Sequence, residues 1–314
     1  MLERFSKVSN LNIIVIGDII LDEYINGTIT RMSAEAPIPI VDKTGSYNIL
    51  GGSANVAANI QSLGANAILL GTIGDDNHGN YISQKLKDLG ISSRFLLQIN
   101  KPTTVKTRVI VDGKQIFRVD NEETSNISAD VEQSLLKSLR SIMENQSVDG
   151  IILQDYNKGI FTKSMIKSVL ELSKLHKITT FVDPKFSNYW HYKGVDFFKP
   201  NKKELFTALN IDALSINDTM LRTRSKLNCK HIVCTLAQDG IAYLSATEFI
   251  QNPTEKVEVV DVSGAGDTTM SMIALAALLG YDAKQILELS NAAGRAACMK
   301  HGVSTITISD LNLL

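Results

Sequence analysis

The residues that point most directly to chemistry lie between Val259 and Asp267, where a short apolar run ends in Gly264-Ala265-Gly266-Asp267. A stretch of small and apolar residues that favours a helix follows. The two glycines allow a tight turn whose N–H groups can approach a ligand closely, and the positive end of the following helix favours an anion there. Asp267 would stand beside this anion, where its carboxylate could take a proton from a hydroxyl. The pattern therefore predicts phosphoryl transfer to an alcohol.

Each part of this pattern also has an ordinary structural explanation. Aspartate is a common helix N-cap and glycine is common in turns, so a lone Gly-Asp before a helix usually indicates only a helix start. The full spacing Asp261-x-x-Gly-Ala-Gly-Asp267 is much narrower. The candidate catalytic residues are therefore Gly264, Ala265, Gly266 and Asp267.

The composition is that of an ordinary globular protein. The chain has 314 residues, 44% hydrophobic and 21% charged, with 32 basic and 33 acidic residues and a net charge of −1. This length fits one large α/β domain or two smaller ones, and the charge gives no sign of a nucleic-acid or membrane partner. The three cysteines lack metal-ligand spacing and are expected to be reduced. The first apolar run is too short for a signal peptide and no run is long enough to span a membrane, so a cytoplasmic protein is expected.

Apolar runs of strand length alternate with helical patterns along most of the chain. This alternation predicts an α/β fold with a mainly parallel sheet covered by helices on both faces. We expect helices at 53–63 and 81–89, and strands at 11–16, 67–70, 150–153, 179–182, 195–198, 231–234 and 257–260.

Two segments, 22–48 and 103–120, interrupt the alternation. The second reads as a hairpin with a turn at Asp112-Gly113, a strong hairpin signal. Together the two segments are predicted to form a small second sheet. Such a sheet would expose edges and one apolar face, which a twofold partner could cover, so a homodimer is expected. The predicted apolar face comprises Ile38, Ile40, Val109, Val111 and Phe117.

Polar residues follow several of the expected strands. In an open parallel sheet, ligands bind outside the carboxyl ends of the strands. Each polar residue alone could be a turn or a helix cap, but five such strand ends on one edge favour a cleft. The polar residues concerned begin at Asp18, Gln154, Asp183, Lys199 and Asp261.

Competing catalytic motifs are missing. There is no G-x-x-x-x-G-K-[ST], which excludes a P-loop, and no G-x-G-x-x-G after the first strand, which disfavours an NAD-dependent enzyme. Neither H-E-x-x-H nor paired C-x-x-C suggests a zinc enzyme. The five histidines are scattered, and none is assigned a role.

Over nearly its whole length the chain resembles the ribokinase-like, or PfkB-type, sugar and nucleoside kinases. Besides the turn before Asp267, the run Gly51-Gly52-Ser53-Ala54-Asn55 resembles the first signature of that family. The resemblance implies a three-layer α/β/α kinase domain over residues 1–314 with a small β-sheet lid. It also implies that Gly51 and Gly52 let the backbone approach the sugar, and that Asn55, Asp18 and Asp22 bind its hydroxyls.

The same resemblance implies an ATP site and a metal site. Asn201-x-x-Glu204 looks like the element that holds Mg²⁺ partly through water, and Asp261 could contribute to a K⁺ site. Where the family has Thr-x-Gly-x-x-Gly, this chain has Thr235-Leu236-Ala237-Gln238-Asp239-Gly240, with alanine for the first glycine. The implied ATP-binding residues are Asn201, Thr235, Gly240, Ser263, Gly264 and Gly266.

One branch of the family fits best, the kinases that phosphorylate D-glycero-β-D-manno-heptose 7-phosphate at C1 on the route to ADP-heptose and lipopolysaccharide. The runs 17–24, 31–37, 155–159 and 183–185 resemble it, although Ala34 replaces a proline. Some members carry a C-terminal adenylyltransferase domain. Because this chain ends at Leu314 soon after the last kinase-like helix, the kinase domain alone is expected.

A substrate that carries a phosphate needs cations on the sugar side. Side chains two apart on a strand share a face, so Lys106 and Arg108 can point together toward the cleft. The candidate residues for the sugar phosphate are Lys106, Arg108, Arg118, Asp155, Lys158 and Lys185.

In the expected mechanism, Asp267 accepts the proton of the acceptor hydroxyl, and the N–H groups of residues 265–267 stabilise the transferred phosphoryl group. The lid would exclude water. Two alternatives stay open: a kinase for ribose, fructose or a nucleoside, and a regulator that binds sugars or nucleotides without catalysis. The presence of Asp267 and both glycines disfavours the regulator.

Overall fold

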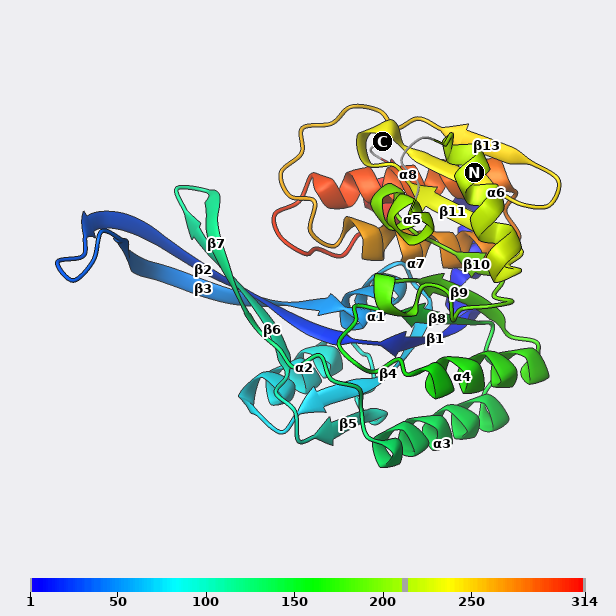
Figure 1. Ribbon diagram of the computed structural model, residues 1–314, viewed down its shortest axis with the longest axis horizontal. Helices are drawn as coiled ribbons and strands as arrows, with labels where there is room; N and C mark the ends of the chain where they lie inside the picture. The colour runs from blue at the N-terminus through cyan, green and yellow to red at the C-terminus, as the bar shows by residue number, and fades with distance from the viewer. Residues whose placement is uncertain (1, 211–213, 313–314) are drawn as a thin grey trace.

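Three layers make up the main body of the protein: a nine-stranded sheet lies between two layers of helices, as predicted (Figure 1). The computed structural model describes residues 2–210 and 214–312, so the ends of the predicted domain, residues 1 and 313–314, lie outside the described residues. A second sheet projects from one side of the body (Figure 1).

The central sheet is parallel except near one edge, where β12 runs antiparallel to both of its neighbours, β11 and β13. Its strand order is β13-β12-β11-β10-β9-β8-β1-β4-β5. Residues 13–16 of β1 are fully buried, as expected for an apolar strand covered on both faces. The bounds are β1 Asn12–Gly17, β4 Asn66–Gly74, β5 Leu96–Ile99, β8 Gly150–Gln154, β9 Thr179–Asp183, β10 Phe197–Phe198, β11 His231–Thr235, β12 Ile241–Leu244 and β13 Phe249–Asn252.

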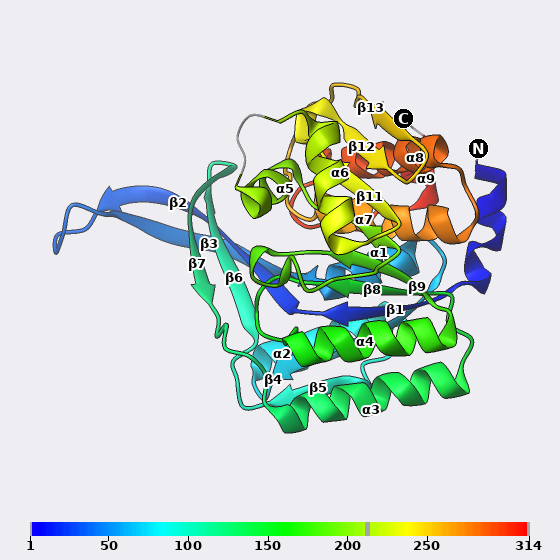
Figure 2. The same cartoon turned by 45° about the vertical axis from the view of Figure 1, so that its right-hand side comes forward.

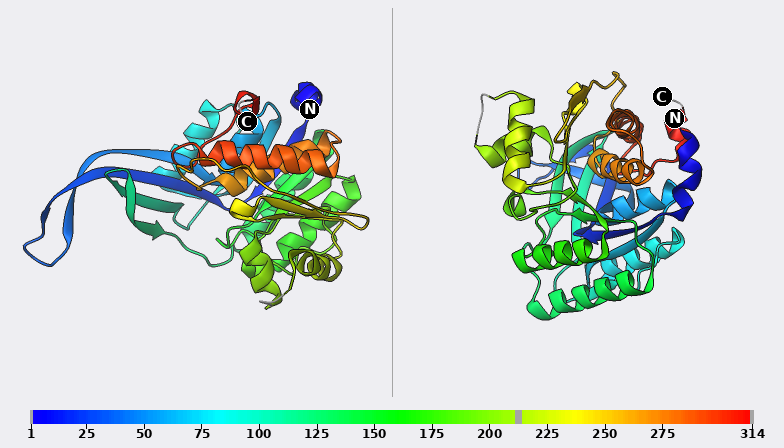
Figure 3. Two further views of the ribbon diagram at one scale, coloured as in Figure 1. Left: turned by 90° about the horizontal axis from the view of Figure 1, so that it is seen from above. Right: turned by 90° about the vertical axis from the view of Figure 1, so that its right-hand side faces the viewer.

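Helices cover both faces of this sheet and form two apolar cores with it (Figures 2 and 3). One face carries α1 Ser53–Ser62, α2 Asn77–Asp88, α7 Ala265–Leu278 and α8 Ala283–Cys298. The other carries α3 Ala129–Asn145, α4 Lys163–His176, α5 Lys202–Leu209 and α6 Ile216–Leu227. Three 3-10 helices and one short α-helix complete the described part of the fold: η1 Leu2–Asn10, η2 Phe186–Asn188, η3 Ala237–Asp239 and α9 Ile308–Asn312.

Two negative expectations can be checked within the described ranges. No helix in residues 2–210 and 214–312 is both long enough and apolar enough to cross a membrane. The three cysteines are free, with Cys229 and Cys234 buried and Cys298 partly buried.

One predicted strand, 257–260, is wrong. Residues 253–259 form no regular element, and Val259, Val260 and Val262 are exposed. The N–H groups of Val260 and Asp261 donate to the carbonyl of Cys298 at the end of α8, so this run has no strand partner. The apolar, β-branched composition predicted a strand, but a strand also needs a neighbour with which to pair.

The two inserted segments do form the predicted second sheet, here called the projecting sheet. It has the order β3-β2-β6-β7, with β2 Ile19–Met32, β3 Pro39–Gly52, β6 Thr104–Val111 and β7 Lys114–Asn121. Asp112 and Gly113 have φ of 49° and 74°, the positive values that a two-residue type I′ hairpin requires. Strands β2 and β3 begin and end closer to the core than predicted, and they project furthest from the body (Figure 1).

The apolar face of the projecting sheet differs in part from the prediction. Val109 and Val111 are only 5% and 6% exposed, so placing them on an open face was wrong. Strand β6 lies between β2 and β7 and is therefore covered on both edges. The exposed large apolar side chains of this sheet and its β2–β3 loop are Ile29, Met32, Ile38, Tyr47, Ile116, Phe117 and Val119.

Candidate active site

Asp267 lies in the first turn of α7 and is 2% exposed. Its Oδ2 accepts a hydrogen bond from Asn55 Nδ2 at 2.9 Å. Its Oδ1 accepts two, from Gln154 Nε2 at 3.0 Å and from the Tyr156 hydroxyl at 2.6 Å. The predicted base and one predicted sugar-binding residue, 212 positions apart in the sequence, are therefore in direct contact.

The environment of Asp267 suits proton transfer near neutral pH. Burial raises the pKa of this carboxyl to about 7, although the hydrogen bonds from Asn55 and Tyr156 oppose the shift. The charge of Asp183 raises this pKa further and that of Lys199 lowers it. A carboxylate with a pKa close to the working pH is well matched to general-base catalysis.

The turn before Asp267 has the features of an anion site. Gly264 caps α7 with φ of 80° and no side-chain hydrogen bond. The N–H of Ala265 donates to the carbonyl of Val262 at 3.3 Å. Within the described residues, the N–H groups of Gly266 and Asp267 have no hydrogen-bond partner. These two groups, at the positive end of a helix, are the ones available to a phosphate.

A buried lysine faces the same turn. Lys199 is 3% exposed, and its Nζ would lie 3.9 Å from a Cβ placed on Gly266. The ammonium pairs with Asp183 Oδ2 at 3.0 Å, and Gln154 Nε2 donates to the same oxygen at 3.0 Å. Gln154 therefore bridges Asp183 and Asp267. A phosphate at the turn would meet both free N–H groups and this cation.

Several residues around Asp267 that the sequence analysis assigned to no function lie at the ends of strands. Gln154 and Asp183 are the last residues of β8 and β9, and Lys199 directly follows β10. Their strand-end positions were recognised in the sequence, and the structure brings the three side chains together beside Asp267. The sequence contained no signal for which of these side chains, or Tyr156, contact Asp267.

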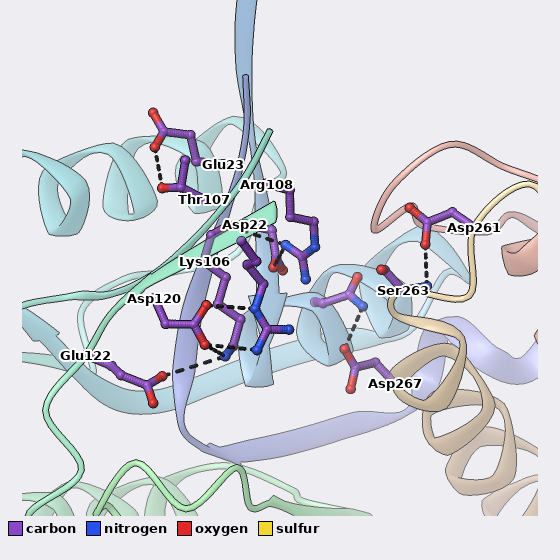
Figure 4. A network of polar contacts seen from close by, with 12 residues as sticks. Asp22, Glu23, Lys106, Thr107, Arg108, Asp120, Glu122, Asp261, Ser263 and Asp267 are labelled. Atoms are coloured by element: carbon purple, nitrogen blue, oxygen red, sulfur yellow. Dashed lines mark hydrogen bonds and ion pairs between the residues drawn. The ribbon is translucent and has the colours of Figure 1, made fainter. Parts of the chain in front are cut away.

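On the sugar side, Asp22 is buried and its Oδ1 pairs with Arg108 Nη1 at 2.5 Å (Figure 4). A Cβ on Gly51 would lie 2.1 Å from Asp22 Oδ2, so the absence of a side chain there makes room for this carboxylate. Gly52 has φ of 59°, and a Cβ on it would lie 2.4 Å from the Asp18 carbonyl. Both glycines therefore fit the β3–α1 turn against β2, beside the predicted sugar site.

Asp18 and Asp155 hold the loop that follows β8. Asp18 accepts hydrogen bonds from three backbone N–H groups within 156–160, and burial raises its pKa to about 6. Asp155 accepts from the Asn157 N–H, the Asn188 amide and the Tyr192 hydroxyl. These contacts give both carboxylates a structural role, and their contact with a sugar stays a prediction.

Three of the predicted phosphate-binding cations gather around two carboxylates. Lys106 Nζ lies 3.1 Å from Asp120 Oδ2 and 3.6 Å from Glu122 Oε2. Arg118 pairs with Asp120 at 2.7 Å, and Lys158 pairs with Glu122 at 2.7 Å. Figure 4 shows Lys106, Asp120 and Glu122 together, on the other side of the Asp22–Arg108 pair from Asp261. The five side chains carry one net positive charge.

The predicted magnesium residues form the start of α5. Asn201 Oδ1 accepts the Glu204 N–H at 2.8 Å, and Glu204 Oε2 accepts the Asn201 N–H at 2.9 Å, which is a capping box. Glu204 Oε1 pairs with Lys185 Nζ at 2.5 Å. In residues 2–210 and 214–312 no group of three or more His, Cys, Asp and Glu could hold a metal. Such a sparse donor set fits Mg²⁺ only when nucleotide phosphates and water complete its shell.

The predicted nucleotide side contains two residues with positive φ. Gly240 has φ of 90°, and a Cβ on it would lie 2.1 Å from the Asn252 carbonyl. Ala237, the residue that replaces a family glycine, has φ of 53° and so adopts the left-handed conformation that glycine favours. At the predicted K⁺ position, Asp261 Oδ1 accepts the Ser263 N–H at 2.8 Å. The contacts of these residues with ATP or K⁺ stay predictions.

Comparison with known proteins identifies relatives over almost the whole chain. Residues 10–310 match the profile of the pfkB family of carbohydrate kinases. The chain is 35% identical over 306 residues to Bifunctional protein HldE of Helicobacter pylori, covering 96% of this chain and 66% of that protein. It is 32% identical over 302 residues to Bifunctional protein HldE of Nitratiruptor sp., covering 95% and 64%. The chain thus spans slightly less than two thirds of the length of these relatives.

Solved structures confirm the predicted fold class. Phosphofructokinase-2 from Escherichia coli in complex with potassium has a TM-score of 0.83 and 19% identity, covering 96% of this chain and 97% of that one. Ribokinase from Arabidopsis thaliana complexed with ribose and ATP has a TM-score of 0.74 and 18% identity, covering 96% and 98%. At these identities the likeness concerns the fold.

The raised pKa of Asp267 predicts a pH-dependent contribution to stability. Because the folded-state pKa is about 7 and the ordinary value is 3.8, the folded protein binds more protons than the unfolded chain between these values. The stability from this group is full below about pH 4 and is lost as the pH rises through 7. The quantity to compare is the free energy of unfolding of the wild type minus that of Asp267→Asn. We expect this difference to fall by roughly a few kcal/mol as the pH rises from about 4 to about 7. Urea unfolding at a series of pH values measures it; a difference independent of pH would contradict the raised pKa.

Proposed function

The chain belongs to the pfkB family of carbohydrate kinases, and from this membership we propose that it uses ATP to phosphorylate D-glycero-β-D-manno-heptose 7-phosphate at the C1 hydroxyl. The product would be heptose 1,7-bisphosphate, a precursor of ADP-heptose and of the lipopolysaccharide core. The observation that carries the proposal is the buried contact between Asp267 and Asn55 at the uncapped start of α7. Because the reaction consumes ATP, we propose a cytoplasmic location.

In the proposed mechanism, Asp267 accepts the proton of the C1 hydroxyl as the oxygen attacks the γ-phosphorus of ATP. The free N–H groups of Gly266 and Asp267 stabilise the charge that builds on the transferred phosphoryl group, and Lys199 adds a positive charge on the facing side. ATP would lie along 235–240 and the 261–267 turn. Its phosphates, with Asn201 and Glu204, would hold Mg²⁺, which supplies further charge neutralisation. A K⁺ ion beside Asp261 and Ser263 is part of the proposal.

The preference for a sugar phosphate rests on the cations beside the projecting sheet. Lys106 and Lys158 are held close together by Glu122, and a dianionic phosphate could replace that carboxylate as their partner. The sugar itself would lie between Asp22, Asn55 and the Gly51-Gly52 turn. The motifs at 17–24, 31–37, 155–159 and 183–185 support the heptose branch over other sugar phosphates.

We also propose that the projecting sheet closes over the sugar as a lid in one kinase domain spanning 1–314, and that two chains pair through it. Seven large apolar side chains are exposed on this sheet and its β2–β3 loop, and strands β3 and β7 are open edges. A twofold partner would cover both features.

An assay of ATP consumption against a panel of acceptors tests the function. We expect turnover of heptose 7-phosphate and little with free heptose, ribose or fructose. Asp267→Asn should bind ATP but lose about 10²- to 10⁴-fold in rate, because it lacks the base. A preference for ribose or fructose would overturn the substrate while leaving the kinase assignment intact, and near-normal turnover by Asp267→Asn would overturn the role of Asp267.

Lys158→Met tests the phosphate site. Loss of one charge-assisted contact should raise the KM for heptose 7-phosphate by about 10- to 100-fold, and Glu122, freed from its partner, adds repulsion. The KM for ATP should stay within about twofold. Lys167→Met is the matched control, because that lysine is 77% exposed on α4. An equal rise in both KM values for Lys158→Met would contradict a phosphate contact at this position.

Light scattering at micromolar concentration tests the dimer. The wild type should have twice the monomer mass, and Phe117→Glu should be a monomer because it places a charge on the exposed face of β7. Leu175→Glu is the control, since Leu175 is an apolar residue that is 75% exposed on α4, outside the projecting sheet. A monomeric wild type would count against pairing through the projecting sheet.

A further inference from the structure

Tyr156 has no role in the reaction as described so far, yet its hydroxyl makes the shortest hydrogen bond to Asp267, at 2.6 Å. An ionised carboxylate offers about four lone-pair positions, two on each oxygen. On Asp267 Oδ1, both are used, by Tyr156 and by Gln154. On Oδ2, one is used, by Asn55, and within residues 2–210 and 214–312 no second donor occupies the other. The two oxygens of the proposed base are therefore not equivalent.

We propose that Tyr156 is a positioning residue which, together with Gln154, saturates Oδ1 of Asp267 and so makes Oδ2 the oxygen that takes the proton of the acceptor. This inference rests on the proposed function, because it assigns an atom within the base of that reaction. Asn55 donates to the same oxygen and belongs to α1, which begins at the predicted sugar site. The free lone pair of Oδ2 is thus next to the residue predicted to bind a sugar hydroxyl.

The loop that carries Tyr156 is held in an unusually constrained conformation. The backbone N–H groups of Tyr156, Lys158 and Ile160 donate hydrogen bonds to Asp18. Both carboxylate oxygens of Asp155 also accept hydrogen bonds. Asn157 has φ of 55°. Gly159 has φ of 93°, and a Cβ on it would lie 1.9 Å from the Ser125 carbonyl. The three hydrogen bonds to Asp18 hold the backbone of this loop, and the 2.6 Å hydrogen bond directs the Tyr156 hydroxyl to Asp267.

The surrounding charges keep Tyr156 a donor. Burial, and then the negative charge of Asp267, raise the pKa of the phenol well above 10, with Asp183 and Asp22 contributing in the same direction. The Lys185 ammonium lies 5.3 Å from the ring centroid, over its face. The titratable groups that interact with Asp267 are Tyr156, Asp183, Lys199 and Lys185. Of these, only Tyr156 donates a hydrogen bond to Asp267.

The chemical step then has a defined path for each atom. The bond between the acceptor oxygen and its proton breaks, and the proton moves to Oδ2. The acceptor oxygen forms a bond to the γ-phosphorus as the bond to the β–γ bridging oxygen breaks, and that electron pair leaves with ADP. Hydrogen bonds from Tyr156 and Gln154 stabilise the ionised carboxylate before the transfer, and once Oδ2 has taken the proton the carboxyl is neutral.

Tyr156→Phe tests the proposal because it removes only the donated hydrogen bond. This bond lowers the pKa of Asp267, so its loss should move the acid limb of kcat/KM from about pH 7 upward by roughly one unit. The rate at pH 7 should fall roughly fivefold, and the rates of variant and wild type should converge above about pH 9. A merely structural defect would lower the rate equally at every pH and leave the limb in place.

Tyr192→Phe is the matched control. Tyr192 also donates its hydroxyl to a buried aspartate, Asp155, at 2.7 Å, but has no contact with Asp267. It should lose similar thermal stability without any movement of the acid limb. An equal shift of the limb in both variants would show that loop disorder, rather than the Tyr156 hydrogen bond, tunes the base, and would overturn the proposal.

Carbon-13 NMR of aspartate-labelled protein provides a readout that needs no acceptor, with the Asp267 carboxyl signal assigned by its loss in Asp267→Asn. Its titration midpoint should rise in Tyr156→Phe and not in Tyr192→Phe. The inference is overturned if the titration midpoint of Asp267 does not rise in Tyr156→Phe. It is also overturned if this midpoint rises but the acid limb of kcat/KM does not move. Failure of the wild type to use heptose 7-phosphate, with the titration shift present and the limb shift seen on another sugar, overturns only the proposed substrate.

Discussion

The constraint on which the rest of the structure depends is the burial of a carboxylate at the start of α7. A buried charge is costly unless hydrogen bonds and nearby charges compensate it. For Asp267 the compensation comes from α1, from β8 and from the loop after β8, and Lys199 after β10 adds a positive charge. Four segments far apart in the sequence must therefore meet at one point: α1, β8 with its following loop, the residue after β10, and α7 itself. The order of the strands in the central sheet is what brings them there.

The helices differ in whether a side-chain oxygen caps the N–H groups of their first turn. Where a side-chain oxygen caps the first turn, as in α2, α3, α4, α5, α6 and α8, the exposed N–H groups are satisfied within the protein. Two of the helices that start in the predicted site, α1 and α7, begin instead at Gly52 and Gly264 with no side-chain cap, whereas α5 keeps its capping box. The missing caps leave donors for a ligand. The glycines also allow the close backbone approaches that a side chain would block.

The sequence predicted the fold class, the second sheet, its hairpin turn and the glycine turn before Asp267, because each depends on local composition and spacing. It failed where the outcome depends on contacts between distant segments. The run 257–260 has the composition of a strand but found no partner, and Val109, predicted on an open face, is buried in the folded sheet. Likewise, polar strand ends predicted a cleft, but the contact of Gln154 with Asp267 spans 113 positions and had no signature in the sequence.

The parallel pairing of β2 with β6 has a consequence for how this protein can change in length. From Ile20 to Gly27 the register with β6 is continuous and sets Asp22 opposite Lys106, whereas the irregularities of β2 with β3 begin only at Asn26. A single-residue insertion in β2 between Ile20 and Asp22 would turn the Asp22 side chain to the face opposite Arg108. Beyond Asn26 the same insertion would alter only the outer part of the β2–β3 hairpin, which projects from the body of the protein. Descendants of this sequence should therefore vary in the length of the outer β2–β3 hairpin, while the stretch from Ile20 to Asn26 keeps a constant length.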